Sequence, residues 1–506
     1  MITQLEQTAG RDESRAELLR HVRPPEWRNP APADRYDLVV VGGGTAGLVC
    51  AMGASGLGAR VALVERHRLG GDCLNSGCVP SKALLRAGRA VGEIRAAAAM
   101  GINVSRVDVS YADVVARVHA RRSHIAEHDS APRLQQAGVD VFFGDGRFVD
   151  PKTISVNGSV LRFRRAVIAT GGRPAVPAIP GLDTIPFLTN ETIFERTDLP
   201  RHLLVIGAGP IGCELAQAFS RFGARVTVVD QARQVLGRDD PRGAALIRRA
   251  LEGDGVQFEL GVSIEAAERR GDDVQLRLMR EPHGDTTRTT VVGDALLVAA
   301  GRAPNIEDLD LDAGAIKADR RGVTVDDRLR TSNPRVYASG DVCSSYKFTH
   351  AADAMSRLVI QNALFFGCRK VSSLIIPSVI YTTPELAHVG ATHADVAASD
   401  KLASITVPLA EVDRAIVDDE TEGFVTVHHE RGRIRGCTIV APHAGDIIGE
   451  AAFALTHGGT LSQLSGTIHP YPTTAEALRK AGDAYRRQAL TPGVRRWLER
   501  YFAWTR

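Results

Sequence analysis

Two uninterrupted apolar runs, rather than alternating ones, give the chain its clearest pattern. Residues 36–41 (YDLVVV) and 202–206 (HLLVI) are almost wholly apolar and rich in β-branched side chains. Such runs are typical of parallel strands that are buried on both faces of a sheet. Each run opens into a glycine-rich turn, a helix and a second strand. The helices are expected over 48–57 and up to about 222, and the second strands at 60–64 and 225–229.

The first glycine-rich turn has the form G-x-G-x-x-G, and each glycine has a physical purpose. Gly42 makes the tight turn, Gly44 lets the backbone approach a pyrophosphate, and Gly47 lets helix and strand pack closely. The pyrophosphate would lie at the helix N-terminus. Glu65 ends the second strand, 23 residues after Gly42, where a carboxylate accepts hydrogen bonds from ribose hydroxyls. This combination predicts a dinucleotide site.

The second unit repeats the same device. Gly207, Gly209 and Gly212 form its G-x-G-x-x-G turn, and Asp230 follows Gly207 at the same spacing of 23 residues. Two complete units imply two bound dinucleotides. The alternative is that one copy is only a scaffold.

Further apolar strands end in glycine turns at 166–171 and 296–301, and they suit chain crossings between two nucleotide domains. Asp341 follows another short strand, where an acid either contacts a cofactor or caps a helix. From about Val371 the pattern alternates, which indicates antiparallel strands at 424–427 and 434–440. Helices are expected at 449–457, 475–488 and 492–502. The last of these has one apolar face, for which packing on the body or on a second subunit is favoured over membrane contact.

Composition excludes several classes of protein. The chain has 506 residues and a formal net charge of +3, too small to indicate nucleic-acid binding. No apolar run reaches the roughly 20 residues of a membrane span, and the polar N-terminus lacks the apolar core of a secretory signal. Seven thinly spread cysteines argue against a secreted disulfide framework. We therefore expect a cytoplasmic protein without metal, nucleic-acid partner or membrane span.

One cysteine pair departs from this even spread. Cys73 and Cys78 lie in the stretch GGDCLNSGCVPSK, with Lys82 four residues beyond the second cysteine. A four-residue loop that contains Gly77 can close a disulfide, and a helix that begins near Pro80 would lower the pKa of a thiol at its N-terminus. The alternative, a metal half-site, lacks a second C-x-x-C or a histidine at ligand spacing.

Together these motifs strongly resemble the FAD-dependent pyridine nucleotide–disulfide oxidoreductases, over about residues 36–486. The resemblance implies an α/β fold with two Rossmann-like dinucleotide-binding domains and a C-terminal α+β dimerisation domain. The implied segments are an N-terminal extension (1–34), the FAD-binding domain (35–165 and 296–370), the NAD(P)H-binding domain (166–295) and the interface domain (371–506). It also implies a homodimer whose active sites are completed by the partner chain.

The resemblance also assigns roles to single residues. It places FAD on the first unit, with Glu65 on the adenosine ribose and Asp341 near the ribityl–pyrophosphate region, and NAD(P)H on the second. Cys78 would be the thiol nearer the flavin and Cys73 the thiol that meets the substrate. Lys82 would lie beside the flavin and pair with Glu214, although from sequence alone these are a first-turn lysine and a buried helix acid. The remaining cofactor-binding candidates are Gly71, Thr170, Gly171, Gly301 and His350.

Two positions bear on the nucleotide and the acceptor. Asp230 favours NADH, because a carboxylate repels a 2′-phosphate, although nearby Arg233 leaves NADPH open. Disulfide-reducing relatives place an acid/base histidine five residues before a glutamate. Here Tyr471 stands five residues before Glu476, and His469 lies two residues earlier. A phenol titrates near ~10 and an imidazole near ~6.5, so Tyr471 is a poor proton shuttle.

A tyrosine at this position resembles the mercuric reductases of the family, but the chain lacks their C-terminal cysteine pair. The sequence therefore favours a flavoprotein that passes electrons from NAD(P)H, through FAD and the Cys73–Cys78 disulfide, to an unidentified small-molecule acceptor. One alternative is dihydrolipoamide dehydrogenase. Another, from a different class, is a redox-sensing flavoprotein switch.

Overall fold

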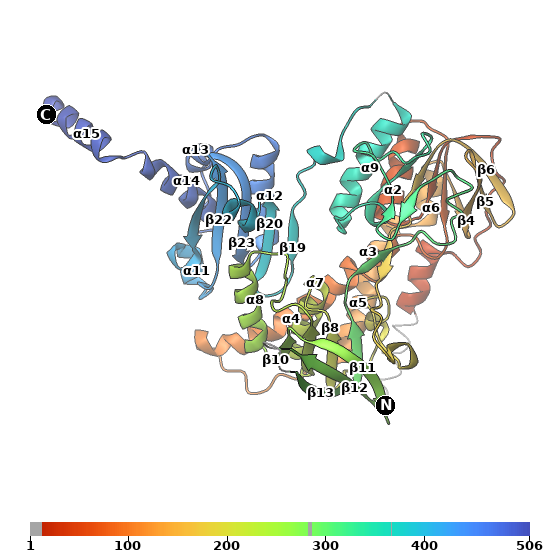
Figure 1. The fold of residues 1–506 in the computed structure, drawn as a ribbon, viewed down its shortest axis with the longest axis horizontal. Coiled ribbons are helices and arrows are strands. Elements are labelled where there is room, and N and C mark those ends of the chain that lie inside the picture. Colours follow the sequence, from red (N-terminus) through yellow and green to blue (C-terminus); the bar gives the residue numbers. More distant parts are fainter. Residues whose placement is uncertain (1–12, 282–285, 366) are drawn as a thin grey trace. The chain divides into compact units, whose positions relative to one another are not determined.

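The computed structural model describes residues 13–281, 286–365 and 367–506, which fall into two compact units (Figure 1). The first unit comprises the described residues of Met1–Gln231 and Gln257–Leu374, and the second comprises Ala232–Val256 and Ile375–Arg506.

The first unit contains a large sheet built on the first apolar run. Its strand order is β3-β2-β1-β6-β5-β4, and β18 also pairs with β6. The parallel register places Val39 beside Ala62 and Ala166, so the apolar run is central, as its uninterrupted hydrophobicity predicted. The strands are β1 (Tyr36–Val41), β2 (Val61–Glu65), β3 (Val139–Phe143), β4 (Gly146–Asp150), β5 (Thr153–Val156), β6 (Ser159–Ile168) and β18 (Val336–Ala338).

The second apolar run forms β8 in a four-stranded sheet of order β10-β9-β8-β14. A three-stranded antiparallel sheet, β11-β12-β13, belongs to the same nucleotide domain, and Leu204 and Leu276 share one core cluster. These strands are β8 (His202–Ile206), β9 (Arg225–Asp230), β10 (Val256–Leu260), β11 (Ser263–Arg270), β12 (Asp273–Arg280), β13 (Thr287–Gly293) and β14 (Ala295–Val298). The chain crosses between the two domains along the antiparallel pair β7 (Gly172–Pro174) and β15 (Arg302–Pro304).

Helices of the first unit pack closely where small residues allow it. Gly88 lies against Ala218, with 3.3 Å between the position of a built Cβ and the alanine Cα, so α4 and α7 cross at short range. Ser356 of α9 donates a hydrogen bond to the Ala46 carbonyl of α2 at 3.0 Å. The helices are α2 (Thr45–Gly56), α3 (Gly71–Asn75), α4 (Cys78–Ala96), α5 (Tyr111–Ala126), α6 (Ala131–Gln136), α7 (Pro210–Phe222) and α9 (Thr349–Leu364), and a short hairpin joins β16 (Ala318–Asp319) to β17 (Gly322–Val323).

The second unit is an antiparallel sheet of order β19-β20-β23-β22-β21 with helices packed on it (Figure 1). Its core joins Val425 and Ile439 of the sheet to Leu478 of a covering helix. The strands are β19 (Ser378–Ile380), β20 (Glu385–Gly390), β21 (Ala403–Pro408), β22 (Phe424–Glu430) and β23 (Arg433–Ala441). The helices are α8 (Pro241–Gly253), α10 (His393–Ala397), α11 (Asp413–Val417), α12 (Ala444–Thr456), α13 (Leu461–Gly466), α14 (Glu476–Gln488) and α15 (Pro492–Thr505).

This architecture confirms the predicted α/β fold with two nucleotide-binding sheets and a C-terminal α+β part. Residues 13–22 of the N-terminal extension are helical, and buried Leu18 and Val22 hold this segment on the first unit. One helix start was wrong, because α12 begins at Ala444 rather than at 449. Its buried residues Ala444, Ile448 and Ala451 continue the helical spacing through two isoleucines that resemble a strand. The boundaries placed after residues 165 and 295 fall inside β6 and β14.

Candidate functional site

The two cysteines of the GGDCLNSGC stretch lie on two consecutive helices. Cys73 is in α3, and Cys78 is the first residue of α4, whose N-cap is Gly77. Both thiols are free; Cys73 is half-buried and Cys78 is exposed. The Cys73 thiol is hydrogen-bonded to Cys78. Two thiols within hydrogen-bonding reach of each other are candidates for a reversible disulfide.

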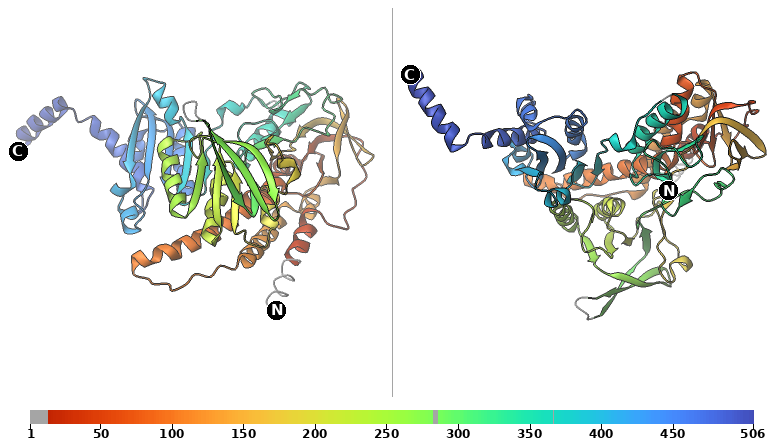
Figure 2. Two further views of the ribbon diagram at one scale, coloured as in Figure 1. Left: turned by 60° about the horizontal axis from the view of Figure 1, so that its bottom comes forward. Right: turned by 45° about the horizontal axis from the view of Figure 1, so that its top comes forward.

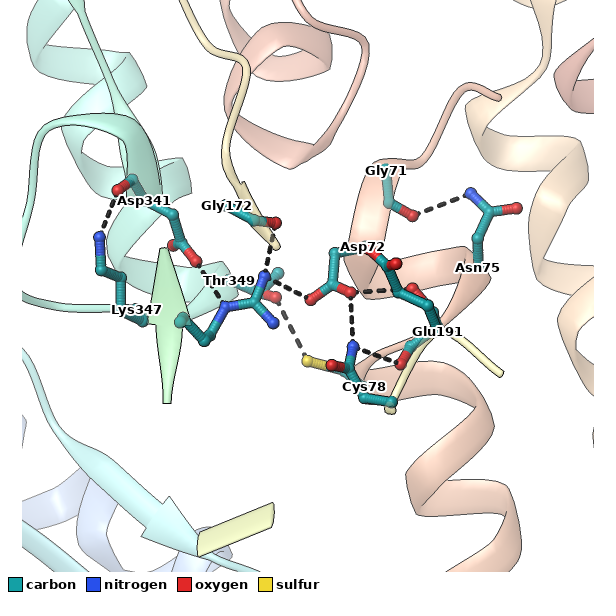
Figure 3. A network of polar contacts seen from close by, with 12 residues as sticks. Gly71, Asp72, Asn75, Cys78, Gly172, Glu191, Asp341, Lys347 and Thr349 are labelled. Carbon is teal, nitrogen blue, oxygen red and sulfur yellow. Dashed lines mark hydrogen bonds and ion pairs between the residues drawn. The ribbon is translucent and has the colours of Figure 1, made fainter. Parts of the chain in front are cut away.

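Cys78 is the more acidic of the two thiols. Its pKa is lowered to about 6, first because the Cys73 thiol donates a hydrogen bond to it and then because Thr349 and Lys82 stabilise the thiolate. Although Cys78 is exposed, the atoms packed around its sulfur partly desolvate it, which acts in the opposite direction. The Cys78 sulfur lies 3.3 Å from Thr349 Oγ1 (Figure 3). The same hydrogen bond raises the pKa of Cys73. The two thiols therefore titrate as one coupled pair, and loss of the first proton is favoured at Cys78.

The expected Lys82–Glu214 ion pair is present. Lys82 Nζ on α4 lies 2.9 Å from Glu214 Oε2 on α7. The Glu214 side chain is buried and that of Lys82 is about one-third exposed. The pair places a positive charge one helical turn from Cys78 and ties the helix of the redox pair to the second nucleotide fingerprint.

The two glycine turns are built alike. Gly42 and Gly207 have positive φ angles of 108° and 112°, which disfavour any side chain. A Cβ at Gly47 would clash with the Gly42 carbonyl, and a Cβ at Gly212 would clash with that of Gly207. These turns therefore need glycine at the predicted positions.

Each turn also has open space beside its second glycine and a carboxylate in contact with its main chain. A Cβ built at Gly44 meets nothing closer than 3.6 Å, and one at Gly209 meets nothing within 4 Å. The Glu65 carboxylate accepts a hydrogen bond from the Gly43 amide, and Asp230 accepts one from the Ala208 amide, each at 2.6 Å. Each carboxylate therefore lies against its glycine turn.

These features fit the dinucleotides that the sequence implies. The open N-termini of α2 and α7 suit pyrophosphates, and the acids at the strand ends suit ribose hydroxyls.

The redox stretch abuts the first glycine turn. A Cβ at Gly71 would lie 2.6 Å from the Gly44 Cα, and Gly70 forms an isolated parallel bridge with Gly44. Only glycine allows this approach. The cysteine pair is therefore placed beside the first dinucleotide turn by main-chain contact.

An arginine network that the sequence did not single out crosses this region (Figure 3). Arg302 lies 3.0 Å from Asp72 and 3.2 Å from Asp341, and it donates to the Gly172 carbonyl at 2.9 Å. Lys347 donates to the Asp341 carbonyl. Burial raises the pKa of the Asp341 carboxyl, and Arg302 acts in the opposite direction. The signal in the sequence was the arginine immediately after Gly301.

The other cofactor-binding candidates lie at strand ends and, for His350, at the start of α9. Thr170 Oγ1 donates to the Asn305 carbonyl at 2.6 Å, which joins the turns of Gly171 and Gly301. His350 stacks on Phe348, with 5.3 Å between ring centroids, at the start of the helix that supplies Thr349. Thr349 was missed from sequence because a lone threonine carries no distinguishing pattern.

In the second unit, Tyr471 does not pair with Glu476. The Tyr471 side chain is 72% exposed, and its hydroxyl donates to Asp413 Oδ2 at 3.1 Å, which raises the pKa of the phenol. Glu476 is buried and pairs with Arg479, and its Oε2 has no partner among the described residues. Asp413 lies 58 positions before Tyr471, so sequence spacing gave no indication of the contact.

The side chain of His469 is buried. Its Nδ1 lies 3.2 Å from the Thr467 carbonyl, its Nε2 lies 3.1 Å from both Glu450 oxygens, and its side chain is 5% exposed. Both ring nitrogens therefore have oxygen partners, and proton transfer to a substrate would require one of these contacts to break.

The described residues contain neither a candidate metal cluster nor a candidate membrane-spanning helix. Within the described ranges, no group of three or more His, Cys, Asp or Glu side chains is arranged to hold a metal ion. None of the helices described there combines the length and apolarity needed to cross a bilayer.

Two family models match the chain. Residues 36–356 match the pyridine nucleotide-disulphide oxidoreductase model, and residues 376–482 match the dimerisation domain of the same family. A mercuric reductase of Staphylococcus aureus is 35% identical over 452 residues, which cover 88% of this chain and 82% of that protein. A dihydrolipoyl dehydrogenase of Thermus scotoductus is 34% identical over 470 residues, covering 90% and 98%.

A solved structure agrees with these matches. The HOCl-induced flavoprotein disulfide reductase RclA from Escherichia coli superposes with a TM-score of 0.78 at 26% identity, over 88% of this chain and 99% of that one. Its Cu(II) complex gives a TM-score of 0.77 at the same identity, over 89% and 100%. The glycine turns, the cysteine pair and these relatives lead to one conclusion: the chain belongs to the FAD- and NAD(P)-dependent pyridine nucleotide–disulfide oxidoreductases.

Proposed function

We propose that this oxidoreductase passes electrons from NADH to the Cys73–Cys78 pair and from there to a soft metal ion bound by the two thiols. The observation that carries the proposal is the asymmetric pair itself. Cys78, with a pKa of about 6, is a thiolate next to a neutral Cys73 thiol, and Cys73 lies beside the first glycine turn.

Each residue of the site has a separate role in the proposed electron transfer. The first glycine turn and Glu65 would hold FAD, which would supply hydride transfer from the nicotinamide and two-electron reduction of the disulfide. Cys78 would face the flavin, and Cys73 would meet the acceptor. The Lys82–Glu214 pair fixes a positive charge beside them. Asp230, whose carboxylate lies on the second glycine turn, favours NADH because it repels a 2′-phosphate.

Proton demand supports a metal ion as the acceptor. Reduction of a disulfide substrate must deliver two protons to the leaving thiolates, which is the task of an imidazole. Reduction of one Hg(II) or two Cu(II) by the thiolates forms the S–S bond and requires no proton on the acceptor. Tyr471 suits the second case, because its hydrogen bond to Asp413 raises its pKa and keeps the phenol protonated. The names of the mercuric reductase relatives and the Cu(II) complex of the structural neighbour agree with this class.

The match to the dimerisation domain supports a homodimer. As in the family, Tyr471 of the partner subunit would then complete each site. Thiolates are strong ligands for soft metal ions, so the two cysteines rather than the phenol oxygen would bind the metal.

Anaerobic titration with NADH tests the redox pair. Two-electron reduction is expected to produce a long-wavelength absorption from the Cys78 thiolate and the oxidised flavin, and this band should be absent in Cys78→Ser. The matched variant Cys73→Ser, which cannot form the disulfide, is expected to show the band before NADH is added and to lose it as the flavin is reduced. If the wild-type enzyme shows no such band at any stage, the central claim fails.

Assays with different electron acceptors test whether the enzyme reduces a metal ion. NADH oxidation is expected with Hg(II) buffered by excess thiol or with Cu(II), and to be slow with lipoamide. Dihydrolipoamide dehydrogenase is the second candidate, because such an enzyme is 34% identical over almost its full length. Fast lipoamide turnover by wild type, not improved in Tyr471→His, would favour that candidate and reject the metal.

A further inference from the structure

The last helix of the chain buries none of its side chains in the described structure. Helix α15 is capped by Thr491, whose hydroxyl accepts a hydrogen bond from the Val494 amide at 3.3 Å. It extends beyond α14, away from the five-stranded sheet of its own unit (Figure 2). The packing of this helix on the body, which the sequence favoured as one option, is therefore not seen.

One face of α15 is aromatic. At 100° per residue, its apolar side chains fall on a single stripe of the helix. Trp504 is 83% exposed and Trp497 is 64% exposed. Trp497 stacks on Tyr501, with 5.9 Å between ring centroids and 12° between planes. The stripe consists of Val494, Trp497, Leu498, Tyr501, Phe502 and Trp504.

The other face is basic. Between residues 486 and 506 the chain carries six arginines and a single acid, Glu499. Three of these arginines lie within α15, where Arg496 is opposite the aromatic stripe and Arg495 and Arg500 flank it. Two more are in the last turn of α14. The arginines are Arg486, Arg487, Arg495, Arg496, Arg500 and Arg506.

A short helix with both aromatic and basic side chains suits some binding partners better than others. Pairing with the same helix of a second copy would bring like charges together. A nucleic acid would satisfy the arginines and leave the aromatic stripe in water. An anionic bilayer surface satisfies both, because aromatic rings enter the headgroup–acyl boundary while arginines reach the phosphates. At 14 residues the helix is about 21 Å long, which suits lying on a bilayer rather than crossing one.

We propose that α15 docks the enzyme on a bilayer with anionic headgroups, with the aromatic stripe in the interface and the arginines on the lipid phosphates. The proposal rests on α15 and the end of α14 alone. It is independent of the electron acceptor.

Tryptophan fluorescence gives a direct test, because two of the three tryptophans are in α15. The third, Trp27, packs edge-on against Phe143 and donates to the Val141 carbonyl, so its environment stays fixed. We would add vesicles of phosphatidylcholine with about one-third phosphatidylglycerol to the full-length, FAD-loaded enzyme. The expected result is a blue-shifted emission and co-sedimentation, both weakened by salt and both absent with phosphatidylcholine alone.

Two variants and a control assign the effect to α15. Arg495→Glu with Arg496→Glu is expected to lower the vesicle partition coefficient at least about tenfold. The control, Arg320→Glu with Arg321→Glu, makes the same charge change on the exposed β16–β17 turn and is expected to bind like wild type. Trp497→Ser with Trp504→Ser is expected to weaken binding to a similar degree.

Four outcomes would overturn the proposal. These are no binding to anionic vesicles, equal loss in the control, unchanged binding in the tryptophan variant, or a change of oligomeric state in that variant by light scattering. Unchanged binding in the tryptophan variant would indicate that the arginines alone attract the protein to a negatively charged surface. The last would show that the stripe belongs to a subunit contact.

Discussion

The acidity of Cys78 depends most on the thiol beside it, and substitution of Cys73 tests this directly. In Cys73→Ala the hydrogen bond to the thiolate is lost, so the pKa of Cys78 must rise from about 6. A hydrogen bond to a charged group contributes about 1.5–3 kcal/mol, and one pKa unit corresponds to 1.36 kcal/mol. Because Cys78 is exposed, the lower end applies, which is a shift of about one unit.

The matched variant is Cys73→Ser, whose hydroxyl still donates. Neither variant can form the disulfide, so the Cys78 thiolate can be titrated beside oxidised FAD without a reductant. The measurement is the long-wavelength absorbance of each FAD-loaded variant against pH. A lowered pKa means that the thiolate is present at neutral pH and is lost as pH falls through the midpoint. We expect a midpoint near pH 6 in Cys73→Ser and about one unit higher in Cys73→Ala.

Thr349→Val extends the series. Its hydroxyl lies 3.3 Å from the Cys78 sulfur and also lowers the pKa, but less than Cys73 does. Its loss should shift the wild-type midpoint upward by a fraction of a unit. Equal midpoints in Cys73→Ala and Cys73→Ser would refute the reasoning. So would a midpoint in Cys73→Ser near the ordinary thiol value of about 8.5.

Three further outcomes follow from single contacts. Lys82→Met removes the ion-pair partner of buried Glu214 and should lower the free energy of unfolding by about 1–3 kcal/mol. This loss is smaller than for a fully buried pair because Lys82 is partly exposed. Thermal unfolding measures the loss, and the double variant with Glu214→Gln should recover part of the stability. Asp230→Ser should raise the kcat/KM ratio of NADPH to NADH roughly tenfold, and an unchanged ratio would contradict the role of its carboxylate. Asp413→Asn should return the pKa of Tyr471 toward its ordinary value, read by ultraviolet titration against Tyr471→Phe; no change would reject Asp413 as the cause of the shift.

The local elements could be predicted because their causes are local. The uninterrupted apolar run at β1 and the steric needs of Gly42 and Gly47 are properties of short segments, and the structure shows both. The Lys82–Glu214 contact spans 132 positions, yet it was expected because the resemblance supplied the pairing. Residue spacing alone would not have identified it.

Long-range polar contacts without a motif were not predictable. Asp413 meets Tyr471 across 58 positions. Arg302, on the crossing strand β15, meets Asp72 on α3 of the same unit. Charged residues are common, so a charge in a loop does not indicate its partner. The predicted start of α12 was wrong for a related reason. Its two isoleucines fit both a strand and a helix pattern in the sequence, and only the burial seen in the structure distinguishes the two.

The structure also changes the explanation of the reactive thiol. A helix N-terminus was expected to lower its pKa, and Cys78 does begin α4. The hydrogen bond from Cys73, one helix earlier, also lowers that pKa, so the spacing of the pair matters in addition to the helix end. Asp72, between the glycines and Cys73, opposes this by raising the pKa of Cys78. Arg302, 3.0 Å from the Asp72 carboxylate, offsets that negative charge and so favours the thiolate without touching either sulfur.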